Sequence, residues 1–194
     1  HRITPDSIGP KTVDGIIVTR HLYEYEKESV GKLGKISAVS PGVLGTTGIE
    51  TADIIKGVCE KTKPDLVILV DALASRKASR VATTVQLSTD GISPGSGIGN
   101  TRKEINSNFL GCDVVSIGVP MVINTETIAY DVLLSMGEKK EIDEIKRYLN
   151  HNDSFIVAPK EADVLSDEMS RVISSAINLI FHDIELEEID GYIS

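Results

Sequence analysis

The stretch Pro64-Asp65-Leu66-Val67-Ile68-Leu69-Val70-Asp71-Ala72-Leu73-Ala74 decides the fold of this chain. Its five consecutive large apolar residues are bounded by turn-forming residues, which is typical of a strand buried on both faces of a parallel sheet. The strand would place the carboxylate of Asp71 at its C-terminal end, and open α/β sheets bind their ligands at that edge. An Asp in this position also caps a following helix, so the stretch alone fits both a site and a cap.

Elsewhere the hydrophobic spacing predicts strands that alternate with helices. We expect helices at residues 5–22, at 47–61 with a capping box from Thr47 to Glu50, and at 72–80, 142–149 and 165–180. We expect strands at residues 35–39, 66–70, 83–87 and 113–120, the third at a sheet edge, and a strand-to-helix switch near Asn124. This order predicts a three-layer α/β/α domain with a mainly parallel sheet.

Composition excludes several classes of protein. The 194 residues carry a formal net charge of −9, which argues against sequence-independent nucleic-acid binding because phosphate contacts need clustered Lys and Arg. No apolar stretch approaches the roughly 18 residues that a bilayer requires, and no secretory signal is visible. We therefore expect a cytoplasmic protein that binds neither nucleic acid nor membrane. We expect one domain over residues 1–184 and an acidic C-terminal tail over 185–194.

Nucleotide binding and serine catalysis find little support. The glycine-rich loop 91–100 has Asn100 where a dinucleotide fingerprint needs its last glycine, and it follows an edge strand rather than a buried one. The same loop spells Gly-x-Ser-x-Gly around Ser93, but Pro94 lacks the N–H that an oxyanion hole needs after the serine. We expect the loop to shape a cleft instead.

Histidine and cysteine patterns also indicate no metal site and no cofactor. His21, His151 and His182 lack metal-ligand spacing. Cys59 and Cys112 have neither metal-ligand spacing nor a redox motif, so we expect both to be structural thiols.

Carboxylates remain as candidates for chemistry. Asp6 lies at the head of the first predicted helix, and it would face the same sheet edge as Asp71 if a strand preceded that helix. Two neighbouring carboxylates push their pKa values apart, leaving one as a proton donor and the other as a base for water. Such a pair can hydrolyse amides, although Asp residues near helix starts are common and the pattern leaves their pairing open.

Several strings of the chain, in order, resemble the germination protease family, also called spore protease. They are Thr4-Pro5-Asp6-Ser7-Ile8-Gly9-Pro10, residues 18–22, residues 40–51, Val70-Asp71-Ala72-Leu73-Ala74-Ser75-Arg76, residues 94–100 and Ile117-Gly118-Val119-Pro120. The resemblance implies an atypical aspartic endopeptidase, made as a zymogen, that degrades small acid-soluble spore proteins in the cytoplasm of the germinating spore. It also implies a fold similar to hydrogenase-maturation endopeptidases, and we expect a homo-oligomer.

The family's two essential aspartates match Asp6, within Thr-Pro-Asp, and Asp71, within Val-Asp-Ala-Leu-Ala. Family members cleave beside an acidic residue, so Arg76, Arg102 or Lys103 would bind that side chain. Members are also longer, and we expect that a propeptide and an N-terminal portion with one sheet strand are absent from this chain. The Asp-Thr/Ser-Gly signature of pepsin is missing at both positions.

Two other functions remain open from the sequence. One is a metal-assisted peptidase like the maturation enzymes, with carboxylates as ligands. The other is a non-catalytic module that holds a peptide or nucleotide in the same cleft.

Overall fold

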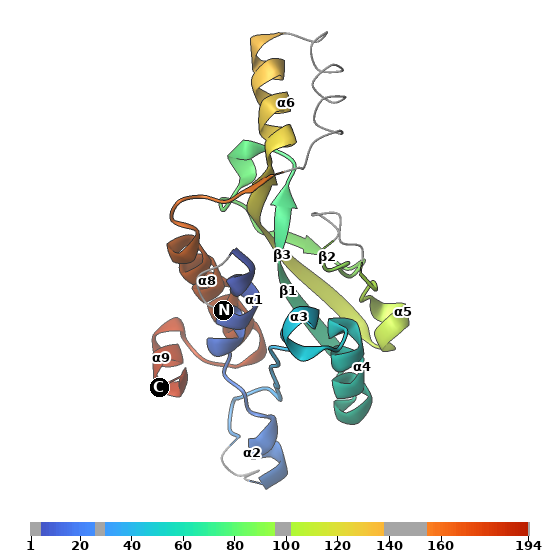
Figure 1. The fold of residues 1–194 in the computed structure, drawn as a ribbon. Helices are drawn as coiled ribbons and strands as arrows, with labels where there is room; N and C mark the ends of the chain where they lie inside the picture. Colours follow the sequence, from blue (N-terminus) through green and yellow to red (C-terminus); the bar gives the residue numbers. More distant parts are fainter. Residues whose placement is uncertain (1–4, 26–29, 96–101, 138–154, 194) are drawn as a thin grey trace.

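The computed structural model describes residues 5–25, 30–95, 102–137 and 155–193, and it is organised around one sheet (Figure 1). Strand β3 (Asp113–Asn124) lies between β1 (Leu66–Ser75) and β2 (Gln86–Ser88). It runs parallel to β1 over the whole length of β1, and antiparallel to β2 and to the short β4 (Ile156–Val157). The sheet is therefore mixed, with its longest pairing parallel.

Helices cover both faces of this sheet (Figure 1). One face carries α1 (Ile8–Asp14), which follows the 3₁₀ turn η1 (Pro5–Ser7), and α8 (Ala162–Phe181). The other face carries α4 (Thr51–Thr62) and α5 (Ser107–Leu110). The remaining elements are α2 (Arg20–Tyr25), α3 (Leu44–Thr47), η3 (Ala78–Arg80), α6 (Thr125–Met136), η5 (Leu186–Glu188) and α9 (Ile189–Ile193). The predicted α/β class is confirmed.

The apolar run of β1 is explained by burial on both sides. Ile68 and Val70 pack in a cluster with Ile8 of α1 and Ile173 of α8. Leu69, which points the other way, packs against Ala52 of α4. A strand covered on two faces needs apolar residues at successive positions, as predicted.

Two long predicted elements are confirmed and two predicted elements are wrong. The strand at 113–120 is β3, which ends at Asn124 before α6, and the helix at 165–180 is α8. The predicted helix at 72–80 is wrong because β1 continues to Ser75, paired with β3 across an irregularity after Leu73. The predicted strand at 35–39 is wrong because the Ile36 carbonyl instead accepts the backbone N–H groups of residues 19 and 20.

Other boundaries shift for local reasons. The helix predicted over 5–22 is interrupted at Gly15, where a Cβ would lie 2.5 Å from the Ser174 hydroxyl. The capping box expected at Thr47 does not form: Gly48 adopts φ +69°, and the next helix, α4, starts at Thr51. The edge strand expected at 83–87 is β2, at residues 86–88. The helix expected at 142–149 lies outside the described residues. In the acidic C-terminal stretch Ile189 is buried.

None of the helices in the described ranges combines the length and apolar character needed to cross a membrane.

The end of α8 is bound to the chain after α1 by buried polar side chains. Asn178 donates to the Gly15 carbonyl at 2.9 Å and accepts the Ile17 N–H at 3.0 Å. His182 Nδ1 accepts the Gly34 N–H at 3.0 Å, so Nε2 must carry the proton and donates to the Ile17 carbonyl at 3.1 Å. A second proton on Nδ1 would face the Gly34 N–H, so this arrangement requires neutral His182.

We therefore expect the contribution of His182 to stability to decrease at acidic pH. Burial lowers its pKa from the ordinary 6.5, although the bond to Ile17 acts in the opposite direction. As pH falls from 7 to 5, the unfolded chain takes up a proton before the folded chain does. The free energy of unfolding should drop by up to about 1.4 kcal/mol per pH unit. In urea unfolding, the difference in the free energy of unfolding between wild type and His182→Gln should shrink over this range.

Helix α1 approaches β1 closely at one glycine. A Cβ on Gly9 would lie 2.9 Å from the backbone oxygen of Val70, closer than carbon and oxygen tolerate. This contact sets how near η1 can come to the middle of β1.

Gly9→Ala should thus destabilise the protein by about 1–3 kcal/mol, because α1 must move away from β1. Gly57 is a matched control: it also lies inside a helix, α4, but open space surrounds its missing Cβ. Gly57→Ala should stabilise by about 0.5–1 kcal/mol. Equal effects of the two substitutions in urea unfolding would contradict the close approach at Gly9.

Candidate active site

Asp71 lies inside β1 rather than at its end. It is opposite Gly118 of β3, and four more residues of β1 follow it. Its Oδ1 accepts the N–H of Ala72 at 2.9 Å. Because β1 continues past Asp71, this aspartate caps no helix, and the capping interpretation is wrong.

The surroundings of Asp71 favour its protonated form. Its pKa is raised from 3.8 to about 6, mainly by burial and in smaller part by the charge of Asp6, while the Ala72 N–H acts in the opposite direction. Asp6 is exposed, in the turn η1 that packs beside β1. The two carboxylates predicted from the sequence thus interact electrostatically.

Opposite Asp71 on β3 is Gly118, and the Leu73 side chain fills the space that a side chain at Gly118 would occupy. Asp71, Leu73 and Gly118 share the face that α4 covers, because side chains alternate along each strand. A Cβ on Gly118 would overlap the Leu73 side chain, so Leu73 lies over this glycine. The apolar cover next to the carboxyl accounts for part of its desolvation. Sequence reasoning missed this contact, for which the only signal was a glycine inside a buried strand.

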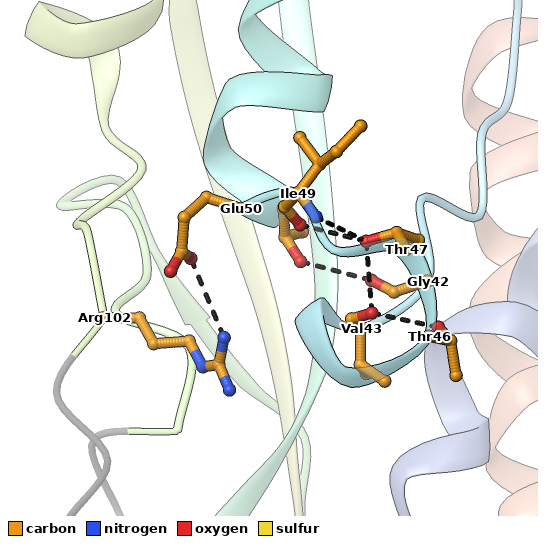
Figure 2. A network of polar contacts seen from close by, with 8 residues as sticks. Gly42, Val43, Thr46, Thr47, Ile49, Glu50 and Arg102 are labelled. Atoms are coloured by element: carbon orange, nitrogen blue, oxygen red, sulfur yellow. Dashed lines mark hydrogen bonds and ion pairs between the residues drawn. The ribbon is translucent and has the colours of Figure 1, made fainter.

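On the same side of the sheet, two ion pairs connect the start of α4 with the segment that follows residue 101, and Figure 2 shows the one between Arg102 and Glu50. Arg102 lies 3.7 Å from Glu50 at the start of α4, and Lys103 lies 3.0 Å from Asp53 one turn later. Hydrogen bonds among residues 42–49 hold the adjacent α3 turn, as Thr47 accepts the Ile49 N–H. Arg102 and Lys103, both predicted to bind an acidic substrate side chain, therefore already have acidic partners.

The glycine-rich loop is closed at its base. Ile92 and Ile105 exchange backbone hydrogen bonds of 2.9 and 2.8 Å, and Gly91 before them adopts φ +93°. Of the cleft-lining stretch 94–100, only Pro94 and Gly95 are described. The predicted role of this loop stays a prediction.

The other candidate residues gain no catalytic context. His21 is exposed, His182 is held by backbone groups, and His151 lies outside the described residues. Within the described ranges, no three His, Cys, Asp or Glu residues gather closely enough to hold a metal ion.

Comparison with known proteins gives the family. The model of peptidase family A25, described as germination protease, matches residues 1–136, a range that includes Asp6 and Asp71. The chain belongs to the germination protease family. Its curated relatives include germination proteases from Caldanaerobacter subterraneus subsp. tengcongensis, at 46% identity over 91% of this chain, from Clostridium tetani, at 41% over 99%, and from Bacillus pumilus, at 39% over 93%. The chain spans 62%, 67% and 63% of the lengths of these relatives, respectively.

The raised pKa of Asp71 predicts a pH-dependent cost to stability. Between about pH 4 and 6 the unfolded chain loses the proton of Asp71 while the folded chain retains it. The free energy of unfolding should therefore fall as pH rises, by up to roughly 3 kcal/mol for a pKa change from 3.8 to about 6. Asp71→Asn removes this titration. In urea unfolding, the free energy of unfolding of the variant relative to wild type should therefore increase as pH rises to about 7.

Asp65→Asn is the matched control, because Asp65 is exposed just before β1. It makes the same chemical change at an exposed position, so it separates the effect of burial from that of the substitution itself. A constant difference between Asp71→Asn and wild type would contradict the buried, proton-holding state of Asp71.

Proposed function

We propose that this chain carries the aspartic peptidase centre of a germination protease, with Asp6 and Asp71 as its catalytic pair. The observation that carries the proposal is the partly buried carboxyl of Asp71, whose pKa is raised to about 6 with a contribution from Asp6. When two carboxyl groups of a hydrolase have unequal surroundings, one commonly acts as the general acid and the other as the general base. Membership of a peptidase family supports the same reaction class.

The two aspartates have different roles in this mechanism. Asp6, exposed at the head of α1, takes a proton from water as the oxygen attacks the peptide carbonyl. Asp71 keeps its proton at mildly acidic pH and gives it to the amide nitrogen as the C–N bond breaks. One proton enters the pair and one leaves it, so a proton transfer between the two carboxyls restores the starting state.

The glycine-rich loop would form one wall of the substrate cleft. Its N–H groups after Pro94 would stabilise the oxyanion that develops on the peptide carbonyl. The described residues on either side of this stretch are held by the pairing of Ile92 with Ile105 and by the ion pair of Arg102 with Glu50.

Small acid-soluble spore proteins are the proposed substrates, cleaved beside an acidic residue. Arg76, directly after β1, or Arg102 and Lys103, would receive that acidic side chain, the last two after exchanging Glu50 and Asp53 for the substrate. The proposal includes action in the spore cytoplasm, synthesis as a zymogen and assembly into a homo-oligomer, for which the family resemblance is the support.

Cleavage of a purified small acid-soluble spore protein, followed by mass spectrometry, tests this function. We expect discrete fragments, and a loss of rate of about 10²–10⁴-fold in both Asp6→Asn and Asp71→Asn, the usual size of an acid–base contribution. Asp65→Asn, with the same charge change before β1, should cleave at the wild-type rate.

Three outcomes would contradict the proposal. Undiminished cleavage by Asp71→Asn would exclude the Asp pair. Loss of cleavage after exhaustive chelation would favour a metal-assisted peptidase. Intact substrate that binds saturably would favour a binding module without catalysis.

A further inference from the structure

One flank of α4 carries a row of charged side chains toward the segment that begins at Arg102. Glu50, Asp53 and Lys56 follow the three-residue spacing that places side chains on the same side of a helix. The first two each hold a cation of the facing segment: Arg102 lies 3.7 Å from Glu50 (Figure 2), and Lys103 lies 3.0 Å from Asp53. The third residue of the row is a lysine, which cannot accept a cation.

The ring of Phe109 in α5 brings two ammonium groups together at the end of this row. The Nζ atom of Lys56 lies 4.7 Å from the centre of the ring, and the Nζ atom of Lys103 lies 4.4 Å from it. The ring attracts each cation, but the two cations repel one another. Among the described residues, Asp53 is the only carboxylate within ion-pair distance of either group. Two positive charges therefore share one negative charge.

Two contacts fix the position of Phe109. Its side chain packs against the buried cluster that contains Ala52 and Val114, and its N–H donates to the Asn106 side chain at 2.9 Å. A Cβ on Gly91 would lie 2.8 Å from the Cα of Asn106, so the base of the glycine-rich loop packs against the same residue. The aromatic ring, with the two lysines on it, is therefore fixed relative to the base of this loop.

The two lysines lie on the side of the sheet that Asp71 faces, but nearer to the start of the strands. Strand β3 begins at Asp113, directly after α5, whereas Asp71 is opposite Gly118. The strand between these two levels is about 16 Å long, at roughly 3.3 Å per residue. An extended peptide covers this distance in about four or five residues. A peptide bound at Asp71 can thus reach the lysines with a side chain remote from the bond that is cleaved.

We propose that Lys56 and Lys103, held on the ring of Phe109, form a subsite for a carboxylate side chain of the peptide substrate, about four or five residues from the scissile bond. The inference rests on the proposed peptidase function. It adds a second acidic contact to the one beside the scissile bond.

The chemistry of this subsite suits a carboxylate. Its two oxygens can accept hydrogen bonds from both ammonium groups, and its charge balances the excess positive charge of the cluster. Lys56 is available without any exchange of partners, whereas Arg102 and Lys103 must first leave Glu50 and Asp53. Lys56 is therefore the residue on which the preference for the remote carboxylate depends most.

Binding of labelled peptides to the 194-residue Asp71→Asn variant tests the subsite separately from cleavage. The peptides carry a single glutamate, moved one position at a time away from the scissile bond, and each has a partner with glutamine in its place. We expect glutamate to tighten binding about 3–10-fold over glutamine when it is about four or five residues away, as for one or two partly exposed ion pairs. The gain should shrink as salt is added, because exposed charges are screened.

Lys56→Gln should abolish this gain, and in cleavage by the protein with Asp71 intact it should raise KM for the remote-glutamate peptide without lowering kcat. Lys56→Glu should reverse the preference, so that a peptide with lysine at the remote position binds better than one with glutamate. Lys61→Gln is the matched control, because Lys61 is an exposed lysine in the last turn of the same helix. It should keep the full preference for glutamate.

The outcomes separate the subsite from the proposed function. Equal binding of the glutamate and glutamine peptides at every remote position, with both still cleaved by the wild type, would overturn the subsite and leave the peptidase function standing. Peptides that are neither bound nor cleaved would overturn both. Inorganic phosphate that competes at Lys56 as well as the glutamate peptide does would identify a site for free anions, which also overturns the inference.

Discussion

The approach of α1 to β1 at Gly9 is the contact on which the candidate site depends. The Val70 carbonyl occupies the space where any other residue at position 9 would place its Cβ. Val70 precedes Asp71, and Asp6 lies three residues before Gly9, so one contact adjusts the position of both carboxylates. Ile8, fully buried beside Val70, holds the same helix against the sheet.

Asp71 is an ionisable group in a strand whose other residues are mostly apolar. The flanking residues Val70 and Ala72 pack with α1 and α8, and Leu73 covers the glycine beside the carboxyl. These apolar neighbours destabilise the ionised form. A residue that weakens its own fold at neutral pH is typical of functional sites, where local stability and chemistry conflict.

The elements that could be predicted from the sequence are those that bury one continuous or regularly spaced apolar surface. Strands β1 and β3 and helix α8 bury continuous or periodic apolar surfaces that a linear pattern reveals. The prediction of a helix from residue 72 is wrong because Ala-Leu-Ala suits a helix locally, whereas the strand continues through its pairing with β3. Residues 35–39 have strand-like composition but bind the backbone at residues 19 and 20 instead. Such choices depend on partners distant in sequence.

The candidate site was predictable only in part for the same reason. Asp71 stood out from its strand, but the residue pattern left its pairing with Asp6 open, and the family strings were needed to single the pair out. The ion pairs of Arg102 and Lys103 join segments about 50 residues apart, and nothing local indicates them.

Strand β3 has a consequence for the order in which this molecule forms. Among the described strands, β1, β2 and β4 each pair with β3. A ribosome releases β1 and β2 first, so neither can pair with β3 until residues 113–124 have emerged. During that interval the most apolar segment of the chain is open to wrong association, which makes early chaperone capture of nascent β1 a physical expectation of this topology.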